Sequence, residues 1–136
     1  MFCLLTYFVK AEDKNVTFSQ VEVVVNDNNY ALEYATTFEQ RAQGLMHRES
    51  MCKSCGMLFN FQKSRGVSMW MKNTLIPLDV AFIRSDGIIL NIEPMQPRDL
   101  SITRSSGKAL YAWEMNQGWF AKNGIGIGDK VSIIGD

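Results

Sequence analysis

Apolar and polar residues alternate over many short stretches of the chain, a pattern that is typical of half-buried β-strands. The first such stretch covers residues 18–25. Turn-forming residues at 26–29 separate it from a second extended stretch at 30–34, so the sequence predicts a β-hairpin there. Further strands are predicted at residues 56–61, 66–71, 78–83, 88–92, 110–115 and 130–134.

Two short helices are predicted between these strands. Thr37 is a typical N-cap residue, Gln40 three positions later completes a capping box, and Gly44 suits the position just after the helix. A second helical turn is predicted over residues 118–122. Because short strands follow one another closely, we expect a mainly β fold, namely an antiparallel β-sandwich or partly closed barrel with one or two short helices.

The charge balance and the lengths of the apolar runs limit the kinds of partner. The chain of 136 residues has 14 basic and 14 acidic residues, and its formal net charge is zero. Nucleic-acid-binding domains generally carry an excess of basic residues, so nucleic acid is not an expected partner. No apolar run approaches the roughly 20 residues that a spanning helix needs, so no integral membrane span is expected.

The N-terminal residues have the composition of a secretion signal. Residues 2–9 form a largely apolar octet, and Val9 and Ala11 have the spacing that a signal peptidase reads. We therefore predict that residues 1–11 are the remnant of a truncated signal peptide and that residues 16–136 form a single domain. The protein is then expected to be exported, with the periplasm as its location. The alternative is that the octet is a first β-strand.

Aromatic, cationic, amide and carboxylate side chains lie near the ends of several predicted strands, where scaffolds usually hold ligand-binding groups. Trp70 offers a ring face for stacking, while Lys72 and Asn73 can donate hydrogen bonds to ligand oxygen atoms. Asp79 and Glu114 are carboxylates inside otherwise apolar strands and need partners if they face inward. The candidate ligand-binding residues are Arg41, Trp70, Lys72, Asn73, Asp79 and Glu114.

Several of these residues have alternative roles. Asn73 can stabilise a turn through its own backbone. Asp79 can form a buried ion pair with Lys72 or Arg41 that fixes a loop. In a different functional class, Asp79 and Glu114 can act as the acid and base of a glycosidase-type hydrolase, provided that their carboxyl groups lie roughly 5–10 Å apart.

Cysteine and methionine residues indicate two further possibilities. Cys52 and Cys55 form a C-x-x-C pair, and in an exported protein a local disulfide bond between them is expected. Alternatively, Cys52, Cys55, Met69 and Met71 form a candidate Cu(I) site, because Cu(I) prefers thiolate and thioether ligands. Such methionines also commonly fill gaps in a core. Apart from Cu(I) in that alternative, no cofactor is expected.

Five short segments carry a recognisable combination of residues. They are Arg41-Ala-Gln-Gly-Leu-Met46, Gly56-Met-Leu-Phe59, Trp70-Met-Lys-Asn-Thr74, Ile76-Pro-Leu-Asp79 and Gly126-Ile-Gly-Asp129. Together they resemble the domain of unknown function 192 family (DUF192) of bacteria and archaea, over about residues 21–134. The resemblance implies a small β-rich domain, commonly carried behind a signal peptide, with no established biochemical activity.

Two departures from the family pattern concern the sulfur-containing residues. Members usually have Phe at the position of Met69, and they usually lack the Cys52 and Cys55 pair. A function drawn from these residues would therefore be particular to this protein and its near relatives. From the whole sequence we predict a non-enzymatic, exported binding or accessory module that takes a small molecule or a glycan, with Cu(I) binding and carboxylate-pair hydrolysis as the alternatives.

Overall fold

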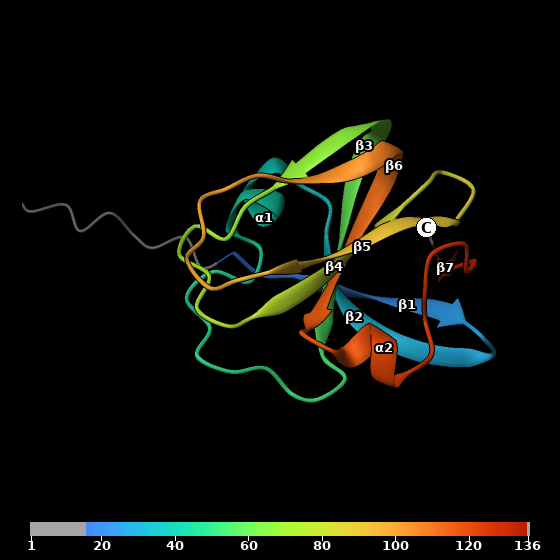
Figure 1. Cartoon of the computed structure of the whole chain (residues 1–136), viewed down its shortest axis with the longest axis horizontal. Coiled ribbons are helices and arrows are strands. Elements are labelled where there is room, and N and C mark those ends of the chain that lie inside the picture. The colour runs from blue at the N-terminus through green and yellow to red at the C-terminus, as the bar shows by residue number, and fades with distance from the viewer. Residues whose placement is uncertain (1–15, 136) are drawn as a thin grey trace, which may run out of the picture.

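The structure confirms the mainly β architecture (Figure 1). The computed structural model describes residues 16–135, so the predicted signal-peptide remnant at residues 1–11 lies outside the described residues. The described part of the chain contains seven strands and two short helices. They are β1 (Ser19–Val25), β2 (Asn28–Ala35), α1 (Phe38–Gln43), β3 (Gly56–Met69), β4 (Leu78–Ile83), β5 (Ile89–Met95), β6 (Thr103–Asn116), α2 (Trp119–Lys122) and β7 (Ser132–Ile134).

The strands of the described residues belong to one sheet with the order β5-β4-β6-β3-β2-β1-β7. Its neighbouring strands are antiparallel except for β2 and β3, which are parallel because α1 and the loop after it form a crossover connection. The sheet is therefore mixed rather than wholly antiparallel. Its two edges do not pair as a ladder, but an isolated bridge between Ile88 and Lys130 brings the segments next to β5 and β7 together. The sheet is not closed, and the high strand content and the two short helices agree with the predicted mainly β fold class.

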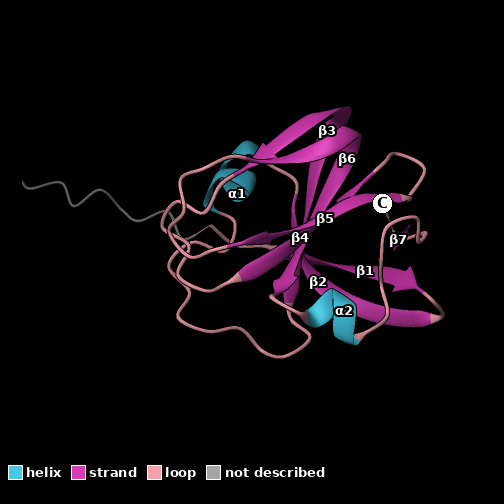
Figure 2. Ribbon diagram, in the orientation of Figure 1, coloured by secondary structure: helices cyan, strands magenta, loops and turns pink. Residues whose placement is uncertain are grey.

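β3 and β6 form a long ribbon that extends beyond the rest of the sheet and curls toward α1 (Figure 2). The two strands predicted at 56–61 and 66–71 are parts of the single strand β3. The pairing register of β3 with β6 shifts between Asn60 and Arg65, and Gln62 has a positive φ of 67° at this point. Bulges of this kind bend a strand, and here the bend places the far half of β3 over α1.

The two faces of the sheet carry different clusters of buried residues. In β6, Tyr111, Trp113 and Met115 belong to the cluster on one face, which we call the aromatic face. Ala112 belongs to the cluster on the opposite face, and Glu114 points to that side as well because side chains alternate along a strand. We call this second side the pocket face.

The aromatic face is closely filled. Trp113 packs against Tyr30, Trp119 and Phe120, with ring centroids 6.2, 5.5 and 5.0 Å away. Trp119 and Phe120 come from α2, which begins directly after β6 and folds back over the sheet. The rings of Trp113 and Phe120 meet edge to face, at 85°, an arrangement that aromatic pairs favour.

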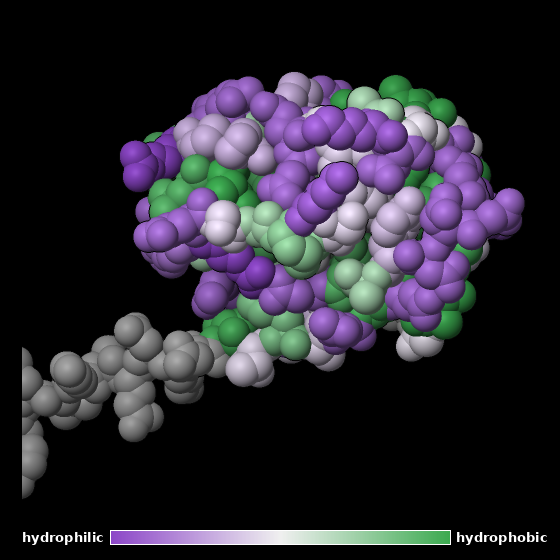
Figure 3. Space-filling model, turned by 90° about the horizontal axis from the view of Figure 1, so that it is seen from below, coloured by the Kyte–Doolittle hydropathy of each residue, from purple (hydrophilic) through white to green (hydrophobic). Residues whose placement is uncertain are grey.

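The surface carries mixed polar and apolar residues. Figure 3 shows one face of the molecule that is covered mostly by hydrophilic residues, with hydrophobic patches between them. Within residues 16–135, no helix has both the length and the apolar character that a membrane crossing requires. Among the described residues, the exposed large hydrophobic side chains are Phe38, Trp70, Leu100, Ile102, Ile127 and Ile134.

Candidate functional site

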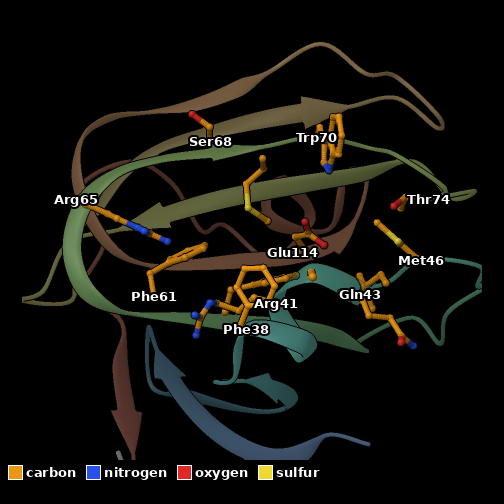
Figure 4. Close-up of a pocket in the computed structure, with 15 residues that line it drawn as sticks. Phe38, Arg41, Gln43, Met46, Phe61, Arg65, Ser68, Trp70, Thr74 and Glu114 are labelled. Carbon is orange, nitrogen blue, oxygen red and sulfur yellow. The ribbon is translucent and has the colours of Figure 1, made fainter. Parts of the chain in front are cut away.

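A pocket lies on the pocket face, between α1 and the curled ribbon of β3 and β6 (Figure 4). Its cavity volume is about 320 Å³, near the lower limit of small-ligand sites, which span about 300–1,000 Å³. Three of the six predicted ligand-binding residues line it, together with aromatic and cationic residues that the sequence did not single out. The lining residues most relevant to its chemistry are Phe38, Arg41, Phe61, Arg65, Trp70 and Glu114.

Glu114 is the buried acid of this pocket. Only 4% of its surface is exposed, and no residue in the described part of the chain donates a hydrogen bond or forms an ion pair with its carboxyl group. Burial raises the pKa of Glu114 to about 8, because removal from water disfavours the charged carboxylate. At neutral pH the group is therefore mainly a neutral acid, which can both donate and accept a hydrogen bond.

α1 forms one wall of the pocket, and its start is fixed by the predicted capping box. The hydroxyl of Thr37 accepts a hydrogen bond from the Gln40 N–H, and the side-chain oxygen of Gln40 accepts one from the Thr37 N–H, both at 3.1 Å. Arg41 then ties the helix to the sheet, because its Nη1 donates to the carbonyl oxygens of Thr36, at 2.7 Å, and Asn60, at 3.1 Å. Arg41 therefore both lines the pocket and holds its wall in place.

The opening of the pocket is aromatic. Phe38 is 75% exposed and Trp70 is 47% exposed, so both present large apolar surfaces to solvent. The guanidinium of Arg65 lies over the ring of Phe61, 5.4 Å from its centroid, and the ammonium of Lys72 lies 5.5 Å from the centroid of Trp70. Figure 4 shows Glu114 deep between Trp70 on one side and Phe61 and Phe38 on the other.

The polar turn after β3 has a structural role. Asn73 has a positive φ of 53°, and its carbonyl oxygen accepts a hydrogen bond from the His47 N–H at 2.8 Å. The N–H of Thr74 donates to the carbonyl of Met71 at 3.1 Å, which closes the turn. Lys72 lies over the ring of Trp70, but neither Lys72 nor Asn73 lines the pocket, so the structure separates both from Arg41 and Glu114.

Asp79 points away from the pocket, which makes the predicted carboxylate pair wrong. In the pairing of β4 with β6, Asp79 lies opposite Met115 and Val80 lies opposite Glu114. Directly opposed residues share a face, and neighbours along a strand do not, so Asp79 and Glu114 are on opposite faces of the sheet. Asp79 instead accepts a hydrogen bond from the Gly118 N–H, at 2.8 Å, just before α2.

The predicted ion pair of Asp79 with Lys72 or Arg41 is also wrong. Within residues 16–135 the ion pairs are Arg48 with Glu33 and Arg84 with Asp86. The otherwise apolar run at 78–82 indicates a buried strand, but it does not show on which face the side chain of Asp79 lies. Here the carboxylate stabilises the segment between β6 and α2.

Cys52 and Cys55 are joined by a disulfide bond in the loop before β3. Met69 lines the pocket, whereas Met71 is 2% exposed in the core of the pocket face. The Cu(I) alternative requires Cys52 and Cys55 as thiolate ligands. In the disulfide-bonded form the two sulfur atoms are bonded to each other and are not thiolates. Within residues 16–135 there is also no group of three or more His, Cys, Asp or Glu residues that could hold a metal.

Sequence reasoning missed Phe38, Phe61 and Arg65. Arg65 has no signal in the sequence, because its place beside the pocket depends on the bulge in β3. The sequence does contain a signal for Phe38. A large aromatic residue in the first turn of a short, mostly polar helix is unlike a core residue, so it indicates an exposed ring that is available for binding. Phe61 has no such signal, because it continues the apolar run of a buried strand.

Several solved structures are similar to this chain, including the following two. The first is from Sinorhizobium meliloti 1021 and is described as a "putative transcription regulator"; it is 37% identical, has a TM-score of 0.83, and the match covers 89% of this chain and 98% of that one. The second, from Novosphingobium aromaticivorans DSM 12444, is described as a protein of unknown function; it is 31% identical, with a TM-score of 0.77 and 89% of each chain covered.

The family assignment follows from the sequence as a whole. A search among curated proteins found no match. The profile of DUF192, a family described as uncharacterised, matches residues 21–133, which include the strands and helices around the pocket. The resemblance predicted from the five segments is thereby confirmed, and the chain belongs to the DUF192 family.

Proposed function

We propose that this protein is a non-enzymatic binding module that takes a small molecule or the end of a glycan in the pocket above Glu114. The observation that carries this proposal is the buried carboxyl of Glu114, which faces a cavity and has no partner in the described part of the chain. Leaving a buried polar group unpaired costs about 1–3 kcal/mol of stability. A ligand that forms a hydrogen bond with Glu114 offsets this cost when it binds.

Binding fits the pocket better than catalysis does. The second carboxylate that a hydrolase would need, Asp79, is on the other face of the sheet. His47 is exposed in the loop after α1 and does not line the pocket. An apolar rim with a few convergent polar groups is instead the usual composition of a small-ligand site.

The description of the Sinorhizobium meliloti protein suggests a different function, which we do not propose for this chain. DNA-binding domains attach to phosphates through an excess of Lys and Arg. This chain has 14 basic and 14 acidic residues, and the arginines nearest the pocket contact backbone carbonyls and an aromatic ring.

The test of the binding proposal is a titration followed by amide chemical shifts in two-dimensional NMR. The probes are single compounds: neutral and acidic monosaccharides, amino acids and nucleotides, each at millimolar concentration. We expect at least one compound to shift the signals of residues around the pocket. If no compound shifts these signals, or if the shifts lie elsewhere, the binding proposal is wrong.

Two variants of carboxylate residues make the test specific. Glu114→Leu removes the hydrogen-bonding group, so we expect it to abolish binding while raising the free energy of unfolding by about 1–3 kcal/mol. Asp79→Asn is the matched control, because Asp79 lies in a neighbouring strand but faces away from the pocket. It should bind as the wild type does. Equal binding by the wild type and Glu114→Leu would contradict the role of Glu114.

We also propose that the protein is exported to the periplasm. The apolar N-terminal octet supports this proposal, and so does the disulfide of Cys52 and Cys55, because disulfides persist mainly in oxidising compartments. The test is to separate the periplasmic and cytosolic fractions of the native organism and to detect the protein in each with an antibody. Detection in the cytosol alone would contradict export.

A further inference from the structure

The charges around the pocket favour an anionic ligand. Arg41 and Arg65 line the pocket, and neither forms an ion pair with a carboxylate of residues 16–135. Glu114 is the one carboxyl group in the lining, and burial keeps it mainly neutral near pH 7. Two cationic groups and a neutral acid attract a carboxylate or phosphate and repel an ammonium group.

The position of Arg65 makes it the residue best placed to bind the anion. Arg41 already donates two hydrogen bonds to backbone carbonyls. The guanidinium of Arg65 instead lies over the ring of Phe61, and none of the guanidinium N–H groups has an acceptor in the described part of the chain. These N–H groups are therefore available for a carboxylate.

The remaining lining residues favour a ring with one apolar face and polar edges. Trp70 and Phe38 provide exposed apolar ring surfaces beside the pocket, on which a ring can stack. Glu114 lies deeper, where a neutral carboxyl group complements a hydroxyl group, because each both donates and accepts hydrogen bonds. Ser68 adds a polar side chain to the lining.

We propose that the ligand is a sugar acid, a pyranose ring that bears a carboxylate, either free or at the end of an acidic glycan. This inference rests on the proposed function, that the pocket is a binding site. The ring stacks on Trp70, the carboxylate pairs with Arg65, and a ring hydroxyl pairs with Glu114. A cavity of about 320 Å³ suits a single ring better than several.

The test compares matched ligands in NMR titrations of the full chain at low salt. The acidic probes are glucuronate and galacturonate, and their neutral counterparts are glucose and galactose. We expect each acid to bind in the pocket about tenfold more tightly than its neutral counterpart, since one charge-assisted hydrogen-bonded pair is worth at least that factor. Three further probes represent other classes of ligand. Glucosamine is a sugar with an amine, benzoate is an anionic ring without hydroxyl groups, and a nucleoside monophosphate is a nucleotide.

The variant Arg65→Gln tests how the anion is recognised. It should remove the preference for the acid, so that glucuronate and glucose bind with similar dissociation constants. Lys63→Gln is the matched control, because Lys63 is an exposed cation two residues earlier in β3 and does not line the pocket. This control should keep the tenfold preference. Loss of the preference in both variants would show a diffuse charge effect and would overturn the role of Arg65.

The other outcomes separate this inference from the proposed function. Equal binding of acidic and neutral sugars, or tighter binding of the amine, benzoate or nucleotide in the pocket, would overturn the sugar acid and leave the binding module intact. No pocket binding by any probe would overturn both. A trimer of galacturonate distinguishes the two sources of the sugar acid: tighter binding than the monomer indicates a glycan end, and equal or weaker binding indicates a free sugar.

Discussion

Trp113 and Glu114 are neighbours in β6, and they show how differently the two faces of the sheet are built. Both residues are buried, at 0% and 4% exposure. In the described part of the chain the indole N–H of Trp113 is enclosed without a hydrogen-bond partner, and no hydrogen bond or ion pair joins the carboxyl of Glu114 to another residue. The indole of Trp113 packs against the rings of Tyr30, Trp119 and Phe120. The carboxyl of Glu114 borders a cavity.

The difference shows when an unpaired buried polar group indicates a binding site. At Trp113 a large apolar ring gains more from burial than one unpaired N–H loses, so packing alone explains the residue. At Glu114 there is no comparable apolar gain, and the carboxyl has space in front of it. We therefore interpret the aromatic face as the part that stabilises the fold and the pocket face as the part that binds.

The largest expected effect is the loss of stability when the aromatic face is opened. Trp113→Ala leaves a cavity among Tyr30, Trp119 and Phe120, and we expect the free energy of unfolding to fall by about 3–5 kcal/mol. Urea unfolding followed by far-UV circular dichroism measures this change. A loss below about 1 kcal/mol would mean that the aromatic face is not the main source of stability.

The next effect is a dependence of stability on pH that arises on the pocket face. The pKa of Glu114 is about 8 in the folded protein and near 4.5 when the chain is unfolded, so between these values the folded state holds one more proton. Stability from this group is complete below pH 4.5 and is lost as the pH rises toward 8. We expect a loss of about 1 kcal/mol per pH unit, or about 2 kcal/mol between pH 6 and pH 8.

The measurement is urea unfolding of the wild type and Glu114→Gln at pH 6, 7 and 8. Gln has nearly the same shape as Glu and does not titrate, so this variant should lack the contribution of Glu114 to the pH dependence. The difference in unfolding free energy between the two proteins should therefore change by about 2 kcal/mol over this range. Parallel profiles would show that Glu114 does not hold its proton in the folded state.

Local chemistry was sufficient to predict much of the fold. The capping box of Thr37 and Gln40 and the strand at 78–83 depend on residues close together in the sequence, and both occur where they were predicted. The crossover that makes β2 and β3 parallel was not predicted, because turn residues do not show which strands pair. Strand pairing is a property of the whole chain.

The site was harder to predict because it depends on register and on a bulge. Asp79 and Glu114 look alike in the sequence, each a carboxylate in an apolar strand, and a shift of one residue in the pairing of β4 with β6 would have placed them on the same face. Arg65 reaches the pocket through the irregular pairing of β3 with β6. Neither the register of β4 with β6 nor the bulge in β3 can be predicted from the pattern of neighbouring residues.

A smaller effect is expected from loosening the helix that walls the pocket. Thr37→Ala removes the side-chain acceptor of the capping box, and we expect it to cost about 1 kcal/mol of unfolding free energy. Amide hydrogen exchange should become faster in α1 and remain unchanged in α2, whose N-cap, Gly118, has no side-chain hydrogen bond. Equal acceleration in both helices would show that the two faces are not independent.

The smallest expected effect on stability comes from the rim of the pocket, and a matched pair of phenylalanines isolates it. Phe38 in α1 is 75% exposed, whereas Phe120 in α2 is 1% exposed. Phe38→Ala should change the free energy of unfolding by no more than about 0.5 kcal/mol, because little apolar surface is returned to water. Phe120→Ala, the control, should cost about 3–5 kcal/mol in the same urea unfolding experiment.

The same pair separates stability from binding. If the rim stacks on the ligand, Phe38→Ala should weaken the binding of glucuronate several-fold although its stability is unchanged. A stability loss of more than about 1 kcal/mol in Phe38→Ala would mean that Phe38 supports the fold. In that case an exposed aromatic residue at a pocket rim would have the same role as the buried aromatic residues on the other face, and the division of the two faces into a stabilising and a binding side would no longer hold.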